Sequence, residues 1–259
     1  MWWFTKFRTY RILKKHGIPD PEWHEATLRL PLVEVLSAAE KARLRVLTTL
    51  FIYEKSFSGV QGLELNLKMK IIIASQACLE ILELGMGSFD GWHEIVVYPG
   101  AFRVERKTMD EQRLVVHDER KSLSGEAWIR GPVILSWDDV KRDSYTLHSG
   151  RHVVLHEFAH KLDMLNGRAN GMPPLHPDMP IKEWTRSLSE AYEHLQKRTQ
   201  NHQSGINPYA VENPAEFFAV MCEYFFTAPQ VLTTEYPHVY DQLKHYFRQD
   251  PLARYSQQG

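Results

Sequence analysis

Two segments in the first third of the chain repeat apolar residues at helical spacing. In residues 33–56 and 68–85 the apolar positions recur every three or four residues, which predicts two long helices. Gly85 comes directly after the second apolar run and predicts the end of that helix. A short extended piece is expected between the two helices, around residues 58–65.

The pattern changes between residues 91 and 137, where short β-branched or aromatic runs are separated by Gly, Asp and Ser. Runs of this kind are typical of strands, and we expect them to form a small mixed or antiparallel sheet. The runs are "EIVVYPGAFRV", "RLVVHD", "EAWIRG" and "PVILSW".

Helical periodicity returns after Trp137. Residues 167–180 are rich in Gly and Pro, which predicts a loop. Because helices precede and follow the strands without β–α–β alternation, the predicted fold class is α+β. The expected helices of this part cover residues 148–166, 182–199, 213–226 and 236–248.

Length and composition suit one folded domain over residues 1–259. The chain is 43% hydrophobic and 24% charged, which is ordinary for a globular protein with a substantial core. We expect this domain to have an N-terminal helical part (1–90), a β-rich part (91–137) and a second helical part (138–259).

Charge and apolarity argue against two kinds of partner. A formal net charge of −1 gives no general attraction to nucleic acid, so no direct nucleic-acid partner is expected. No stretch reaches the roughly 18 consecutive apolar residues that a membrane span needs.

Cys78 and Cys222 lie in apolar contexts and are expected to be core residues. Without a disulfide framework or a signal-peptide pattern, the expected location is cytoplasmic.

The N-terminal segment "MWWFTKFRTYRILKK" mixes aromatic residues with cations. Two interpretations stay open: a terminal helix that docks on the body of the protein, or a segment that contacts a partner or a membrane surface. The aromatic and apolar residues near helical spacing are Trp3, Phe7, Tyr10 and Leu13.

The segment "VVLHEFAHKLDML", residues 153–165, places ionisable groups in an apolar helix, where they need a partner or a metal. His156, Glu157 and His160 form the pattern H-E-x-x-H. Residues four apart share a helix face, so both imidazoles can bind one zinc ion. The intervening glutamate is not a ligand, and it can take a proton from a zinc-bound water. The residues expected to anchor the opposite face are Leu155, Phe158, Leu162 and Leu165.

A catalytic zinc ion has a third protein ligand, which we expect from "NPYAVENPAEFFAVMCEYFF". Asn213 and Pro214 predict the start of a helix, with Glu216 in its first turn. A glutamate there also complements the helix dipole, which is an alternative explanation for it. Glu216 ranks first as the third ligand, Glu212 second and Glu223 third.

Three further residues have candidate roles around this site. Asp163 suits a residue that orients a histidine through its other ring nitrogen. His152 lies too far along the helix to share a metal with His160, and is expected to support the site or to lie at the surface. Tyr209 could donate a hydrogen bond to a reaction oxyanion, with ordinary packing as the alternative.

The pair "HEFAHKLD" and "YAVENPAEFFAV" resembles the Mlc titration factor A family of bacterial zinc-dependent peptidases. The resemblance extends to "WHEIVVYPGAF" and "GPVILSW", and the Tyr–Glu pair is distantly similar to the catalytic domain of anthrax lethal factor. It implies a zincin-like metallopeptidase with gluzincin-like ligands, in which helices flank the small sheet and the H-E-x-x-H helix. It also implies one zinc ion per chain bound by His156, His160 and Glu216, with Glu157 as base and Tyr209 at the oxyanion.

The resemblance carries further expectations about activity and partners. A peptide substrate would lie along an edge strand, for which "PVILSW" is the candidate. The family is associated with aminopeptidase activity on small peptide-like substrates and with binding the glucose repressor Mlc. The alternative is a non-catalytic protein that sequesters such a transcriptional repressor and keeps a vestigial zinc site.

Overall fold

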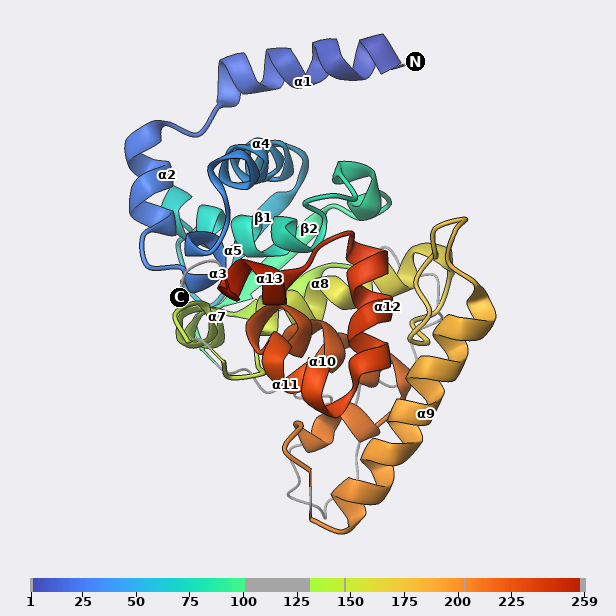
Figure 1. Ribbon diagram of the computed structural model, residues 1–259. Helices are drawn as coiled ribbons and strands as arrows, with labels where there is room; N and C mark the ends of the chain where they lie inside the picture. The colour runs from blue at the N-terminus through green and yellow to red at the C-terminus, as the bar shows by residue number, and fades with distance from the viewer. Residues whose placement is uncertain (1, 101–130, 147, 203, 257–259) are drawn as a thin grey trace.

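The computed structural model describes residues 2–100, 131–146, 148–202 and 204–256, with side chains from Lys6 onward (Figure 1). Helices make up most of the described chain, and one small sheet lies among them. The N-terminal helices are α1 (Trp2–His16), α2 (Asp20–Thr27), α3 (Pro31–Glu34), α4 (Ala38–Glu54) and α5 (Leu67–Glu80).

The long helix predicted at 33–56 is two helices, α3 and α4, that meet at Ser37. The Ser37 hydroxyl accepts a hydrogen bond from the Glu40 amide at 3.3 Å, and the Glu40 carboxylate accepts one from the Ser37 amide at 2.8 Å. This reciprocal capping box satisfies amides that have no partner within the helix, so it starts a new helix in the middle of an apolar run.

The described strands are β1 (Ser56–Gly59), β2 (Glu94–Tyr98) and β3 (Val133–Ser136), in the order β1-β2-β3. Both strand pairs are parallel, so the prediction of a mixed or antiparallel sheet is wrong for them. For β1 and β2 the reason is the connection: α5 lies between them and carries the chain back to the same end of the sheet. The strands predicted within 101–130 lie outside the described residues.

The C-terminal half is helical, as predicted, with more short helices than the periodicity indicated. Helices predicted at 182–199, 213–226 and 236–248 are present within one or two residues, while the one predicted from 148 begins at Val153. The elements are α7 (Trp137–Ser144), α8 (Val153–Asp163), η2 (Met164–Asn166), α9 (Ile181–Gln200), η3 (Pro208–Val211), α10 (Pro214–Thr227), α11 (Pro229–Glu235), α12 (Pro237–Phe247) and α13 (Pro251–Ser256).

The core of the described structure is built around α8, which packs against α5 on one side and α10 on another. Phe158 of α8 contacts an aromatic group under the sheet, with ring centroids 5.3 Å from Phe89 and 5.6 Å from Trp92. Cys78 and Cys222 are fully buried and unpaired, which confirms their predicted place in the core. None of the helices in the described ranges has the length and apolarity needed to cross a membrane.

Candidate metal centre

The H-E-x-x-H segment lies in α8. His152 is the N-cap residue, and its ring nitrogen Nδ1 accepts a 3.4 Å hydrogen bond from the Leu155 amide. Leu155, Phe158 and Leu162 are completely buried, as predicted for the anchoring face, but Leu165 lies past the end of α8 and is 39% exposed, so its predicted anchoring role is wrong. Burial of that face fixes the rotation of the helix, so the histidines point in the opposite direction.

Glu216 is presented by the first turn of α10. The Asn213 side chain caps the helix by accepting hydrogen bonds from the amides of Ala215 (2.9 Å) and Glu216 (3.0 Å), and Pro214 occupies the first turn. The capping chemistry predicted from the sequence is therefore confirmed. Since the rest of α10 is buried in the core, its N-terminus is held firmly over α8.

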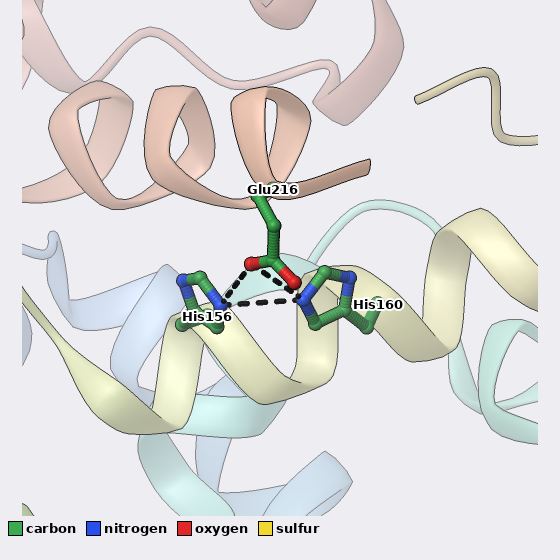
Figure 2. Close-up of side chains that lie close together, drawn as sticks. All are labelled: His156, His160 and Glu216. Atoms are coloured by element: carbon green, nitrogen blue, oxygen red, sulfur yellow. Dashed lines mark hydrogen bonds and ion pairs between the residues drawn. The ribbon is translucent and has the colours of Figure 1, made fainter. Parts of the chain in front are cut away.

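Figure 2 shows the Glu216 carboxylate lying over the rings of His156 and His160. The carboxylate oxygen Oε2 is 3.0 Å from Nε2 of His156 and 3.3 Å from Nε2 of His160. The two Nε2 atoms are 3.2 Å apart. One ligand atom from each residue lies within 4.8 Å of the other two, so the three side chains can hold a metal ion together.

The site is only slightly open to solvent, with 13% of the His156 side chain and 10% of the Glu216 side chain exposed. Burial opposes the charged form of His156, but hydrogen bonds to Glu216 and Glu223 outweigh it and raise its pKa to about 10. Burial also disfavours the Glu216 carboxylate, yet the two histidines lower its pKa well below the usual range. Without a metal ion, protonated imidazole therefore balances the carboxylate charge.

A second buried carboxylate lies behind His156. Glu223 lies two helical turns after Glu216 on α10. Its Oε1 atom accepts a 2.8 Å hydrogen bond from Nδ1 of His156. Its other oxygen accepts from the backbone amide of His152. The Nδ1 contact leaves Nε2 as the nitrogen directed at Glu216, which is the arrangement that prepares a histidine to bind a metal. Glu223 was ranked third as a ligand. In the structure it contacts Nδ1 of His156, the ring nitrogen that points away from Glu216 and His160.

His152 and Asp163 are buried at opposite ends of α8: His152 precedes its first turn and Asp163 is its last residue. His152 is 1% exposed, so its predicted alternative surface position is wrong, and its Nε2 lies 2.6 Å from Oε1 of Gln76 in α5. Burial lowers the pKa of His152 to about 4. Asp163 accepts a 2.7 Å hydrogen bond from the Gly171 amide rather than one from a histidine. In the described part of the chain, Asp163 Oδ1 and His160 Nδ1 are both buried without a hydrogen-bond partner.

Tyr209 and Glu157 lie beside the three clustered side chains. The ring centroid of Tyr209, in η3, is 5.9 Å from that of His156, and the tyrosine is 37% exposed. Glu157 is partly buried, and its charge contributes to the raised pKa of His156. Glu212, ranked second as a ligand, is exposed and lies outside the group that could hold a metal.

Sequence reasoning did not single out Glu80, which is fully buried in α5. Neither carboxylate oxygen has a hydrogen-bond partner in the described structure. Complete burial raises the pKa of Glu80 well above its usual range, with His156 lowering it and Glu223 raising it. The only signal in the sequence was a lone carboxylate inside the apolar run "ACLEIL".

Two histidines one turn apart on a buried helix, with a carboxylate from a later helix, define a metal centre of the metallopeptidase type. The model of the glucose-regulated metallo-peptidase M90 family matches residues 4–248, and the chain belongs to this family, which includes Mlc titration factor A. The resemblance drawn from the two C-terminal motifs is thereby confirmed.

Relatives of similar length support this membership. Mlc titration factor A of Klebsiella pneumoniae subsp. pneumoniae is 38% identical over 247 residues, covering 94% of this chain and 91% of the relative. Proteins of the same name from Yersinia pestis and Yersinia pseudotuberculosis are each 39% identical over 237 residues, covering 90% of this chain and 86% of the relative.

Proposed function

We propose that this chain is a zinc-dependent peptidase that acts as an aminopeptidase, with one zinc ion held by His156, His160 and Glu216. The convergence of their ligand atoms within 4.8 Å is the observation that carries the proposal. Two imidazole nitrogens and a carboxylate oxygen form a donor set typical of catalytic zinc sites. The hydrogen bond between His156 Nδ1 and Glu223 fits the same purpose, since it leaves Nε2 directed at the other two ligands.

Each neighbouring residue has a role in the proposed hydrolysis. When bound, a zinc ion supplies a Lewis acid for the scissile carbonyl and acidifies a water molecule towards neutral pH. Glu157 accepts a proton from the attacking water and delivers it to the leaving amine. Tyr209, next to His156, donates a hydrogen bond to the oxyanion.

The proposed peptide substrate lies along β3. Among the described strands β3 is at the edge of the sheet, and it packs against α8. A strand at the edge of a sheet has backbone amides and carbonyls that can pair with an extended peptide. A substrate in that position would run past the helix that carries His156 and Glu157.

The test is the Glu157→Gln variant, which keeps the shape of the side chain and removes its ability to accept a proton. We expect hydrolysis of aminoacyl 4-nitroanilides to fall by at least about 100-fold, while zinc content by elemental analysis stays at the wild-type level. Glu212→Gln is the matched control, because Glu212 is exposed and outside the cluster. Wild-type turnover by Glu157→Gln would contradict the role of Glu157.

A second candidate function is binding of a Mlc-like transcriptional repressor. It is favoured by the name Mlc titration factor A that the relatives carry. A pull-down with purified Mlc, with and without a zinc chelator, separates the two functions. Binding that survives the chelator, together with no hydrolysis of any peptide, would favour a repressor-sequestering protein with a vestigial zinc site.

A further inference from the structure

The N-terminal helix α1 has two opposite faces with different surroundings. On one face Ile12 is buried, with only 5% of its surface exposed, where α1 packs against α4. The other face carries Phe7 and Tyr10, which are 59% and 60% exposed. The Arg11 guanidinium lies 6.0 Å from the centroid of the Phe7 ring on the same helix. Both aromatic side chains stay more than half exposed, so they form an apolar surface that the described part of the body does not cover.

The attachment of α1 to the body uses residues other than this aromatic pair. Arg8 forms a 2.9 Å ion pair with Glu54 at the end of α4, and the rings of His16 and Tyr53 have centroids 4.8 Å apart. Figure 1 shows α1 at the outer edge of the molecule, with α4 beside it and the sheet further inside. The aromatic face is therefore free to meet another surface while the helix stays attached.

The charge of α1 indicates what that surface carries. The helix has basic residues from Lys6 to its C-terminal end and no acidic residue: its cations are Lys6, Arg8, Arg11, Lys14 and Lys15. Arg11 and Lys14 are exposed one helical turn after Phe7 and Tyr10, so they flank the aromatic pair. With five Lys or Arg residues and no acidic residue, α1 has a formal charge of +5, whereas the whole chain has a net charge of −1, so the rest of the chain sums to −6.

We propose that α1 is an interfacial helix that docks this protein on the surface of a lipid bilayer rich in anionic headgroups. Exposed aromatic rings enter the boundary between headgroups and acyl chains, while lysine and arginine side chains meet the anionic headgroups. The same charges disfavour a second copy of the chain as the occupant, because two such helices would bring like charges together. The docking requires neither the metal centre nor the proposed peptidase activity.

The experiment is flotation of the full-length protein with vesicles of phosphatidylcholine alone or with phosphatidylglycerol added. We expect the wild-type protein to float with phosphatidylglycerol vesicles, to stay unbound with phosphatidylcholine vesicles, and to bind less as salt is raised. Arg11→Glu with Lys14→Glu should weaken the apparent affinity by more than about tenfold. The double variant Phe7→Gln with Tyr10→Gln should weaken the apparent affinity to a similar extent, by about tenfold. Glutamine favours the helical conformation, so α1 should stay folded in this variant.

Matched control variants lie on α9, which is far from α1 in Figure 1. Ile181, which is 61% exposed, is changed to Gln to match the aromatic variant. Lys182→Glu with Arg186→Glu, at two exposed cations, matches the charge variant. These controls should bind vesicles like the wild-type protein, and equal melting temperatures would show that all variants fold.

Three results would overturn the proposal. One is failure of the wild-type protein to float with phosphatidylglycerol vesicles, and another is unchanged binding when the aromatic pair on α1 is replaced. The third is a different partner for α1 in a protein that does not bind vesicles. It would be seen as binding to single-stranded RNA, or as self-association without lipid, that the α1 variants abolish.

Discussion

Glu223 is the residue that most directly affects how His156 can act. An imidazole has two nitrogens, and a hydrogen bond from one to a carboxylate decides which nitrogen keeps its lone pair for a metal. The 2.8 Å contact between Glu223 and His156 Nδ1 therefore holds both the ring orientation and the tautomer. Glu223 is itself held by the backbone amide of His152, so its carboxylate cannot turn away without losing a buried hydrogen bond.

Replacing Glu223 by Gln is expected to weaken zinc binding by about 10- to 100-fold, because the amide accepts from Nδ1 without the negative charge that makes the ring a better ligand. The measurement is a competition titration with a chromophoric chelator at fixed pH. Glu212→Gln, at an exposed position on the approach to α10, is the control and should leave the dissociation constant unchanged. Equal zinc affinity in the Glu223 variant would show that its carboxylate does not tune the site.

Lys55 provides a test of burial away from the metal centre. Its ammonium group donates hydrogen bonds to the carbonyls of Phe89 and Trp92, and burial lowers the pKa of Lys55 to about 8. In the unfolded chain the pKa of the lysine is near its ordinary value of 10.5, so between about pH 8 and 10.5 the unfolded state binds more protons. The contribution of Lys55 to the free energy of unfolding therefore rises with pH through that window and is lost as pH falls through about 8.

The Lys55→Met variant should lack this rise. Urea unfolding from pH 7 to 10 should show the wild-type free energy of unfolding increasing relative to the variant as pH rises above 8. Lys182→Met, at an exposed position, should show no such difference from the wild-type protein. A constant difference between wild type and Lys55→Met over the whole range would mean that Lys55 keeps an ordinary pKa.

At the scale of elements, the start of a helix decides where the site residues lie. Asn213 sets the start of α10 and so places Glu216 in its first turn, while His152 sets the start of α8 one turn before His156. Capping by Asn213 could be predicted, because Asn followed by Pro is a local signal. The start of α8 was predicted five residues early, at 148 rather than Val153, since a histidine is not among the usual capping residues.

Gly171 ties the loop after α8 to the start of α10. Its φ of +78° is in the left-handed region, and a Cβ atom there would lie 2.5 Å from the backbone oxygen of Pro214. Its amide donates to Asp163, and its carbonyl accepts a 3.1 Å hydrogen bond from the Trp184 indole. The loop, α8 and α10 therefore meet at one residue without room for a side chain.

Gly171→Ala is expected to cost about 1–2 kcal/mol for the left-handed conformation and about 1–3 kcal/mol more for the overlap with Pro214. Denaturant unfolding measures the total. Gly62→Ala is the matched control, because Gly62 has a similar φ of +81° with nothing near the added Cβ, so only the conformational cost applies. If both variants lose the same stability, the contact with Pro214 is not tight.

At the scale of the whole molecule, the candidate metal centre joins helices that are distant in sequence. His156 and Glu216 are 60 residues apart, and α8 and α10 meet only because each buries an apolar face in the same core. A bound ion would add a cross-link between these helices, so metal binding and stability of the fold are coupled.

Zinc at 100 times its dissociation constant is expected to stabilise the protein by about 2.7 kcal/mol, which corresponds to a melting temperature about 5–10 °C higher. Differential scanning calorimetry with zinc or with a chelator measures the shift. The shift should be absent in Glu216→Ala and present in Glu212→Ala. A full shift in the Glu216 variant would rule out Glu216 as a ligand.

The sequence by itself determined those features that depend on neighbours along the chain. Helical spacing requires His156 and His160 to share a face, and the cap at Asn213 brings Glu216 to a helix start, because both follow from backbone geometry within one or two turns. Only the tertiary structure decided what each of these carboxylates contacts, since that depends on how α10 packs over α8: Glu216 reaches both histidines, and Glu223 lies at Nδ1 of His156. The parallel sheet and the exposed aromatic face of α1 were decided in the same way, because strand direction follows from the path of the connections and exposure follows from which face the body covers.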